Sequence, residues 1–299
     1  MISLRIAVVE KITSFELRTK ILADFVQKKV VSARELDKIK QAHDDHQKTL
    51  DEVLAWLQKN EISFERFSLR LKLDLDAFEC VITVGGDGTL LAVSHQIKNP
   101  TILLGVRSSG TSVGFLCCCD QSSFATVMER LLKNTLKIAT VDRVSARITH
   151  AGDQLHIRSC PALNDILYTN ENPAATTRYI INLNGKSEAH HSSGIWLSTA
   201  AGSTAGIFSA GGQQMDLEDP RIQYCVRELY TFQNRNFELS RGFIDLPAVK
   251  SPAHEPAFFI ENRCDRAVIA LDGQEEILYM EWGDKVEFMR DASLRLAIA

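Results

Sequence analysis

One short segment of the sequence has the residue types of a phosphate-handling site. It is Gly85-Gly86-Asp87-Gly88-Thr89, which follows the apolar run Phe78 to Val84 and precedes a helical pattern that begins near Leu90. Glycines let a backbone approach a phosphate closely and present its N–H groups, and the amino end of a helix adds partial positive charge. The carboxylate of Asp87 then either takes a proton from an attacking hydroxyl or holds Mg²⁺. The alternative is a plain strand-to-helix turn in which Asp87 caps the helix.

A second segment indicates a pocket for a bulky ligand. Residues 199–212 are mostly Gly, Ala, Ser and Thr, and they follow an apolar strand pattern at 195–197. Small side chains leave room for a ligand, and hydroxyls supply hydrogen bonds to it. The alternative is a helix packed tightly through its small residues. The polar pair Asn164-Asp165, which has apolar neighbours, fits either a ligand site or a turn.

The elements that must position the first segment alternate between strand and helix patterns. A strand is predicted at Ile2 to Val9, a helix from about Phe15, and a second long helix from the capping box at Ser32 to Glu35. Buried strands are predicted at Phe78 to Val84 and at Thr101 to Val106, with a helical pattern between them. This alternation is typical of a parallel sheet with helices on its faces.

The pattern changes from about Arg143 to short alternating runs. Turn pairs at Gly152-Asp153, Asn184-Gly185 and Asp272-Gly273 favour tight hairpins, because both residues of such a pair accept positive φ. We therefore predict an α/β plus all-β protein. Residues 1–140, which the C-terminal segment 285–299 rejoins, are expected to form a parallel-sheet α/β domain, and residues 141–284 an antiparallel β-sandwich-like domain.

Composition and charge exclude several classes of protein. The chain has 299 residues, of which 24% are charged and 45% hydrophobic, enough for one large domain or two moderate ones. The 34 basic and 38 acidic residues leave a formal net charge of −4, so we expect neither nucleic acid nor an anionic membrane as a partner. No apolar stretch reaches the ~20 residues that span a bilayer, and the first residues lack the pattern of a signal peptide. We expect the protein in the cytoplasm.

The cysteines and two histidines were weighed as metal ligands. Three of the seven cysteines are consecutive, at 117–119, a spacing that suits neither a disulfide framework nor a zinc site, so we expect buried thiols. His43 and His46 form an i, i+3 pair on the second predicted helix. The pair could hold a metal, but no third ligand is evident nearby.

Three motifs, taken in order, resemble the NAD kinase family. That family has a Gly-Gly-Asp-Gly-Thr loop, an Asn-Glu or Asn-Asp pair, and a Gly-Ser-Thr-Ala segment that ends in Ser-Ala-Gly-Gly. This chain has them at 85–89, at 164–165, and at 202–205 with 209–212. The similarity continues at Gly114-Phe115-Leu116 and at Leu271 to Gln274, so it covers nearly the whole chain. Ser192-Ser193-Gly194 stands where most members have Gly-Asp-Gly, which is similar to the branch typified by the mitochondrial NAD kinases of animals.

The resemblance implies transfer of the γ-phosphoryl group of ATP to the 2′-hydroxyl of the adenosine ribose of NAD, giving NADP. Asp87 is then the general base, and Gly85, Gly86, Gly88 and Thr89 bind phosphate. The residues that the resemblance assigns to NAD binding are Phe115, Asn164, Asp165, Ser193, Gly202, Ser203, Thr204, Ala205 and Ser209. In a chain with net charge −4, Mg²⁺ or another divalent cation must neutralise much of the phosphate charge. The family generally assembles into dimers or tetramers, so we expect a homodimer or homotetramer.

Two departures from the family pattern concern the nicotinamide-ribose end of the pocket. Ser193 replaces a frequent ligand-binding aspartate, and Gly206 stands where a tyrosine commonly follows Thr-Ala. No spacing marks the basic residues for a triphosphate; Arg107, Arg178 and Lys186 are candidates only because they lie near the motifs. The sequence leaves open whether the donor is ATP, another nucleotide or polyphosphate, and whether NADH is also an acceptor.

Three other functions were weighed. Lipid kinases of the diacylglycerol and sphingosine type share the Gly-Gly-Asp-Gly-Thr loop but usually continue with Asn-Glu, whereas Leu90-Leu91 follows here. Gly110 to Gly114 matches the G-x-S-x-G string of serine hydrolases, but no helix start follows it. A catalytically silent nucleotide-binding module would explain the changes at Ser193 and Gly206, although Asp87 is retained.

Overall fold

Two units make up the chain. The computed structural model describes residues 4–28, 30–69, 72–98, 100–110, 114–152, 155–231, 236–249 and 258–298. One unit, here called the N-terminal unit, comprises residues 1–139 and 294–299, and the C-terminal unit comprises residues 140–293. The strands β6 (Ile138–Thr149) and β17 (Lys285–Ala297) each contribute residues to both units.

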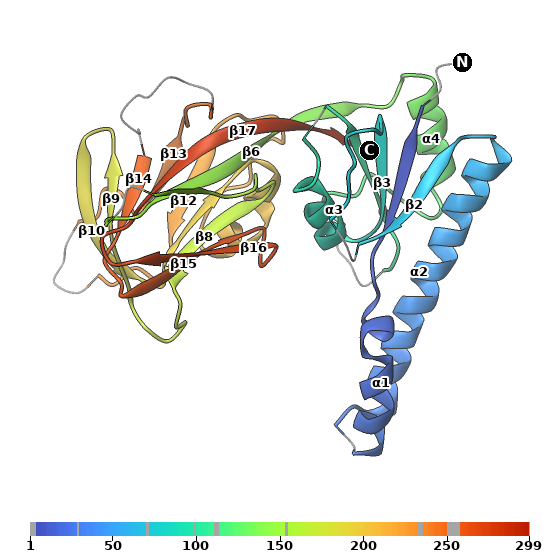
Figure 1. Cartoon of the computed structure of the whole chain (residues 1–299), viewed down its shortest axis with the longest axis horizontal. Coiled ribbons are helices and arrows are strands. Elements are labelled where there is room, and N and C mark those ends of the chain that lie inside the picture. Colours follow the sequence, from blue (N-terminus) through green and yellow to red (C-terminus); the bar gives the residue numbers. More distant parts are fainter. Residues whose placement is uncertain are drawn as a thin grey trace. The chain divides into compact units, whose positions relative to one another are not determined.

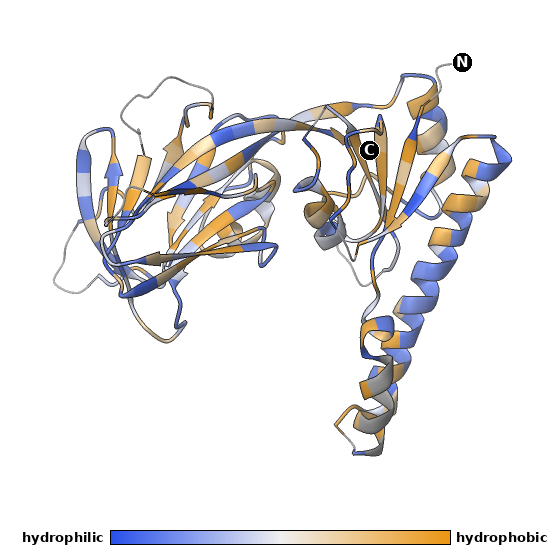
Figure 2. Ribbon diagram, in the orientation of Figure 1, coloured by the Kyte–Doolittle hydropathy of each residue, from blue (hydrophilic) through white to orange (hydrophobic). Residues whose placement is uncertain are grey.

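A parallel sheet forms the centre of the N-terminal unit (Figure 1). Its main strands are β1 (Ile6–Glu10), β2 (Phe64–Ser68), β3 (Cys80–Gly85) and β4 (Ile102–Arg107), in the spatial order β2-β1-β3-β4. The short strand β5 (Cys119–Asp120) and the end of β17 both pair with β4, also in parallel. Strands β1 and β3 are hydrophobic along most of their length (Figure 2), as expected for strands that helices cover on both faces.

Helices α2 (Ala33–Lys59) and α4 (Phe124–Leu132) pack on one face of this sheet. Leu50, Val53 and Leu57 recur along α2 and are buried against the strands, which contributes ~1.5–3 kcal/mol for each such side chain. Ser32 caps α2 and exchanges hydrogen bonds with Glu35, so the predicted capping box is confirmed. Helix α1 (Ser14–Gln27) lies along the first half of α2, and α3 (Asp87–Ser94) follows β3 (Figure 1).

Two antiparallel sheets form the C-terminal unit. The first has the order β10-β9-β14-β17, with β6 beside β17 and β7 beside β6, and the second has the order β13-β12-β11-β8-β15-β16. Buried side chains from both sheets form one core between them, which is the arrangement of a β-sandwich. The strands not yet bounded are β7 (His156–Arg158), β8 (Asp165–Asn170), β9 (Thr177–Leu183), β10 (Lys186–Ser192), β11 (Ile195–Ser198), β12 (Ile222–Val226), β13 (Arg241–Ile244), β14 (Phe258–Asn262), β15 (Arg266–Leu271) and β16 (Glu276–Glu281). A 3-10 turn, η1 (Ala201–Thr204), and the short helix α5 (Gly206–Ser209) follow β11.

The predicted fold class is confirmed: a parallel α/β sheet and an antiparallel sandwich are both present. Asn184-Gly185 and Asp272-Gly273 have positive φ at both positions, with values of 48° and 80° and of 45° and 83°. Asn184-Gly185 forms the predicted two-residue hairpin loop between β9 and β10, whereas Asp272-Gly273 begins a four-residue loop, 272–275, between β15 and β16. Asp153, of the third predicted turn, lies outside the described residues. No helix in the described part of the chain is long and apolar enough to cross a membrane.

Candidate active site

The glycine loop lies at the topological switch point of the parallel sheet. Strand β2 lies on one side of β1 in the strand order, and β3 and β4 lie on the other side of β1. In sheets of this order, ligands bind outside the carboxyl ends of the strands where the direction reverses. Strand β3 ends at Gly85 and α3 begins at Asp87, so the loop occupies this place.

Two glycines of the loop, Gly85 and Gly88, are needed for different reasons. A Cβ on Gly85 would overlap the side chain of Thr89, which is buried, so the packing of the protein itself requires glycine there. Gly88 is exposed, and a Cβ on it would meet nothing within 4 Å. Its small size is therefore not needed for packing and leaves the first turn of α3 open to a ligand.

Asp87 is held by backbone amides from a distant loop. The N–H of Phe115 donates to Oδ2 at 3.0 Å and the N–H of Leu116 donates to Oδ1 at 2.9 Å. Asp87 does not cap its own helix: the N-cap of α3 is Gly86, and no side-chain hydrogen bond caps that end. The helix also begins three residues before the predicted start near Leu90. A carboxylate has about four lone-pair positions, so two amides orient it and leave acceptor capacity for a proton or a cation.

Phe115 itself is exposed, at 68% of its surface, beside the carboxylate that its amide binds. Gly114 precedes it with φ at +71°, and a Cβ there would come within 2.7 Å of Cδ of Arg107. The 114–116 loop therefore depends on glycine to reach Asp87 over the Arg107 side chain. Thr111 to Val113 of the G-x-S-x-G string lie outside the described residues.

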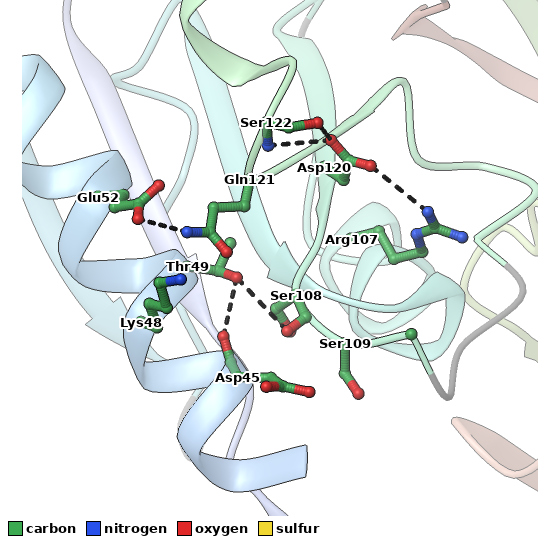
Figure 3. Close-up of a pocket in the computed structure, with 11 residues that line it drawn as sticks. Asp45, Lys48, Thr49, Glu52, Arg107, Ser108, Ser109, Asp120, Gln121 and Ser122 are labelled. Atoms are coloured by element: carbon green, nitrogen blue, oxygen red, sulfur yellow. Dashed lines mark hydrogen bonds and ion pairs between the residues drawn. The ribbon is translucent and has the colours of Figure 1, made fainter. Parts of the chain in front are cut away.

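A polar cavity of about 460 Å³ lies at the carboxyl ends of β4 and β5, beside α2 (Figure 3). Its lining includes Lys48 and Thr49 of α2, and Arg107, which reaches Asp120 at 3.5 Å. Hydrogen bonds from the hydroxyls of Ser122 and Ser123 lower the pKa of Asp120 to about 2. Arg107 therefore has an ionised partner within the protein and is not free to serve a triphosphate alone.

In the C-terminal unit, the backbone of Asn164 joins the second and third motifs. The N–H of Thr199 donates to the carbonyl of Asn164 at 2.9 Å, and a Cβ on Gly202 would overlap that same carbonyl. The Oδ1 atom of Asn164 is buried and has no hydrogen-bond partner among the described residues. Because buried acceptors are normally satisfied, this orphan atom indicates a ligand that donates to it.

Asp272, which the sequence placed in a turn and in the family-like stretch 271–274 but to which it gave no site role, fixes the pair Asn164-Asp165. Its carboxylate accepts the N–H groups of Leu163, Asn164 and Asp165 at 2.8, 2.8 and 3.0 Å. Burial, and secondarily the negative charge of Asp272, raise the pKa of Asp165 to about 7. A carboxyl group that titrates near neutral pH is a feature of functional sites.

The small-residue segment is only partly available to a ligand. The hydroxyl of Ser203 donates to the carbonyl of Ala200 at 2.7 Å and accepts from the N–H of Met215 at 3.0 Å, so it is used within the protein. Thr204 and Ala205 are half-buried, and Ser209 is exposed at the end of α5.

Gly206 has a local explanation. A Cβ on it would come within 2.8 Å of the Trp196 ring. The Trp196 ring thus lies against the place where the NAD kinase pattern commonly has a tyrosine. An aromatic group is still present beside this segment, but it comes from β11.

Ser193 lies apart from the other predicted NAD-binding residues of its unit. In the β8–β11 pairing, Ser198 lies opposite Asp165 and Ile195 opposite Tyr168. Ser193 precedes the Ile195 end of β11, whereas Asn164 and Thr199 lie at its Ser198 end. At ~3.3 Å per residue, these ends are separated by roughly 10 Å or more. Ser193 instead lines a cavity of about 330 Å³ with Arg178 and His191.

The histidine pair considered as a metal site has other partners. Nδ1 of His43 lies 2.9 Å from Oγ1 of Thr13, and Nδ1 of His46 lies 3.0 Å from Oγ of Ser108. The described residues contain no group of three or more His, Cys, Asp or Glu side chains that could hold a metal ion. All seven cysteines are free, and five of them are buried.

Comparisons with known proteins agree with these motifs. Residues 5–136 match the family model of the ATP-NAD kinase N-terminal domain. The NADH kinase of Arabidopsis thaliana is 31% identical over 236 residues, which is 72% of this chain and 70% of that protein. A probable NADH kinase of Oryza sativa subsp. japonica is 27% identical over 272 residues, 83% of this chain and 80% of that protein.

Solved structures share the fold. The crystal structure of an NAD kinase from Archaeoglobus fulgidus in complex with ATP has a TM-score of 0.65 and 18% identity, and the match covers 98% of this chain and 93% of that one. The yeast NADH kinase complexed with NADH has a TM-score of 0.69 and 17% identity, and the match covers 99% of this chain and 84% of that one. The sequence motifs, the architecture and the relatives lead to one assignment. The chain belongs to the NAD kinase family.

Proposed function

We propose that this protein transfers the γ-phosphoryl group of ATP to the 2′-hydroxyl of the adenosine ribose of NAD, giving NADP. The observation that carries the proposal is Asp87, a carboxylate that two backbone amides orient beside a glycine loop at the switch point of the sheet. The names of the relatives, NADH kinase and NAD kinase, support the same reaction.

In this reaction Asp87 is the general base. It accepts the proton of the 2′-hydroxyl while the hydroxyl oxygen attacks the γ-phosphorus, and the bond from that phosphorus to the bridging oxygen of ADP breaks. The unpaired N–H groups at the amino end of α3 would stabilise charge on the phosphate oxygens; the N–H of Thr89 is not one of them, because it donates to the carbonyl of Gly86 at 3.0 Å. Phosphoryl transfer needs mainly positioning and charge neutralisation, which these groups supply.

A divalent cation fits the acceptor set of the glycine loop. Mg²⁺ is usually bound through one or two carboxylates together with substrate phosphates, and Asp87 keeps free acceptor capacity. When bound, Mg²⁺ neutralises charge on the donor phosphates. The donor phosphates would supply most of the ligands of this cation, and Asp87 is assigned to the proton.

For NAD binding, the orphan Oδ1 of Asn164 and the carboxyl of Asp165 support contacts to the adenosine part. Thr204 and Ala205 would line the base pocket, Ser209 and Phe115 are proposed as further NAD contacts, and Gly202 and Ser203 shape the segment. Residues 1–140 with 285–299, and residues 141–284, would act as the two domains that carry these groups. A cytoplasmic location stays a prediction.

Homo-oligomers would explain the position of Ser193. Ser193 lies roughly 10 Å or more along β11 from Asn164, at the other end of the strand. A homodimer or homotetramer allows Ser193 to meet a ligand bound by another copy. Sedimentation analysis of the purified protein tests this proposal, and a monomer at all assay concentrations would contradict it.

The activity is tested by incubating the purified protein with Mg²⁺, ATP and either NAD or NADH. An NADP-specific or NADPH-specific enzyme then reads out the product. We expect product with at least one acceptor, and we expect excess EDTA to stop its formation until Mg²⁺ is restored. No product with either acceptor, while nucleotides still bind, would instead favour the catalytically silent module.

A further inference from the structure

The loop after β1 lies against the glycine loop and holds an unused cation. Glu10, the last residue of β1, pairs with Val84, and the N–H of Lys11 donates to the carbonyl of Val84 at 3.2 Å. Lys11 therefore lies next to Gly85, the first residue of the glycine loop. These are the two loops that flank the switch point, where ligands bind in sheets of this order.

Near the carboxyl ends of these strands, Lys11 differs from Arg66 and Arg107 because no described acidic side chain pairs with it. Arg66 binds Glu10 through two hydrogen bonds, and Arg107 binds Asp120. Within the described part of the chain, no acceptor binds the ammonium group of Lys11. The residue is half-buried, and burial lowers the pKa of its ammonium group. A partly buried charge without a partner is costly, and an anionic ligand would remove that cost.

Hydrogen bonds tie the loop after β1 and the glycine loop to the same helix, α2. Oγ1 of Thr13 donates to Glu16 at 2.9 Å and also contacts His43 of α2. His46 contacts Ser108 after β4, and the N–H of Ser108 donates to the carbonyl of Gly85 at 2.9 Å. The β1 loop and the glycine loop are thus both tied to α2, which holds Lys11 beside the phosphate-binding backbone.

We infer that Lys11 binds the polyphosphate chain of the phosphoryl donor, between the β1 loop and the glycine loop. This inference rests on the proposed kinase function. The glycine loop itself contributes amides and one carboxylate but no cation, while phosphoryl transfer requires positive charge at the donor phosphates. A lysine ammonium acts as a point charge toward phosphate, as in other phosphate-binding loops. The donor is a nucleoside triphosphate or an inorganic polyphosphate, which share this chemistry.

The test measures binding rather than turnover. The dissociation constants of a non-hydrolysable ATP analogue with Mg²⁺, of inorganic tripolyphosphate and of NAD are determined by calorimetry. The variants are Lys11→Met and Lys11→Arg, with Lys98→Met as the control. Lys98 is an exposed lysine between α3 and β4, near the amino end of β4 and thus away from the carboxyl ends where the glycine loop lies. Thermal unfolding shows that each variant is folded.

We expect Lys11→Met to raise the dissociation constant of the ATP analogue by about tenfold or more, because one charge-assisted hydrogen bond is lost. NAD binding should stay within about twofold of wild type. Lys11→Arg should retain most of the donor affinity, and Lys98→Met should match wild type. If tripolyphosphate alone shows the loss, the donor is a polyphosphate rather than a nucleotide.

Unchanged donor binding by folded Lys11→Met would overturn the inference, as would equal losses for donor and NAD. If Lys11→Met does not fold, unchanged donor binding by Lys11→Gln has the same meaning. The proposed function is judged separately from product formation by the wild type. A wild type that binds the ATP analogue through Lys11 but forms no NADP would contradict the function and leave the Lys11 site standing.

Discussion

At the scale of single residues, Asp87 accepts two backbone amides and has no cationic partner among the described side chains. Asp87→Asn keeps the shape but removes the proton acceptor. We expect kcat to fall by roughly 10²–10⁴, the usual worth of general-base catalysis, with NAD affinity retained. Asp74→Asn, at an exposed aspartate of the same unit, is the control and should keep full activity. Near-normal turnover of Asp87→Asn would show that another group is the base.

Asp165 predicts a pH dependence of NAD binding. Its pKa of about 7 means that the carboxyl is largely protonated below neutral pH and ionised above it. The ionised form accepts the stronger hydrogen bond from a ribose hydroxyl. The dissociation constant of NAD should therefore fall by up to about tenfold per pH unit as pH rises toward 7, and then level off. Asp165→Asn should show a flat profile; a profile like that of wild type would assign the titration elsewhere.

The sequence reveals a functional residue when its role follows from the residues next to it in the chain. Asp87 and its glycines are recognisable because strand, loop and helix are contiguous. Asp272 and Lys11 are not, because what distinguishes each is a contact with a segment far along the chain, residues 163–165 in one case and Val84 in the other. The sequence did hold one indication for Lys11. It directly follows the first strand, and the glycine loop begins at the end of another strand of the same sheet.

At the scale of elements, the contact between η1 and the residue before β8 holds two motifs together. A Cβ on Gly202 would overlap the backbone carbonyl of Asn164, and backbone cannot move aside as a flexible side chain can. Gly202→Ala should cost ~1–3 kcal/mol of unfolding free energy and weaken NAD binding. Gly152→Ala, where a Cβ meets nothing within 4 Å, is the matched control and should stay within about 0.5 kcal/mol of wild type. Denaturant titration measures both, and equal stabilities would mean that the two segments are not in tight contact.

Buried elements were predictable from the sequence, whereas the edge strands β2 and β10 were not. Strand β3 is buried throughout, and its apolar run marks it clearly. Among the residues that the structure describes, β2 pairs with β1 alone and β10 with β9 alone, so each has one unpaired edge. Their sequences, FERFS and KSEAHHS, are polar and give no continuous apolar run. Charged residues on such edges are a common protection against pairing with other chains.

At the scale of the whole molecule, His46 links stability to pH. The side chain is fully buried, and burial, followed by the charge of Lys11, lowers its pKa to about 4. The unfolded chain, in which this pKa is ~6.5, binds the proton more readily. Stability from His46 is therefore complete above about pH 6.5 and is lost as pH falls toward 4, by up to ~1.4 kcal/mol per pH unit.

Asp165 changes the stability of the folded state in the opposite direction to His46 over part of the same pH range. Its raised pKa favours the folded state at low pH, and that contribution is lost as pH rises toward about 7. The His46 effect is therefore isolated by comparing wild type with His46→Asn. In urea unfolding between about pH 4.5 and 7, the free energy of unfolding should fall less on acidification for the variant than for wild type. Parallel curves would show that His46 is protonated equally in both states.

The central claim is that the 2′-hydroxyl of the adenosine ribose receives the phosphoryl group. It is tested most directly by ³¹P NMR of the product formed from NAD, ATP and Mg²⁺, compared with authentic NADP and its 3′-phosphate isomer. We expect one new phosphomonoester signal that coincides with NADP, and we expect this signal to be absent with Asp87→Asn. A phosphate at the 3′ position, or no phosphorylated dinucleotide from an enzyme that binds both substrates, would contradict the account.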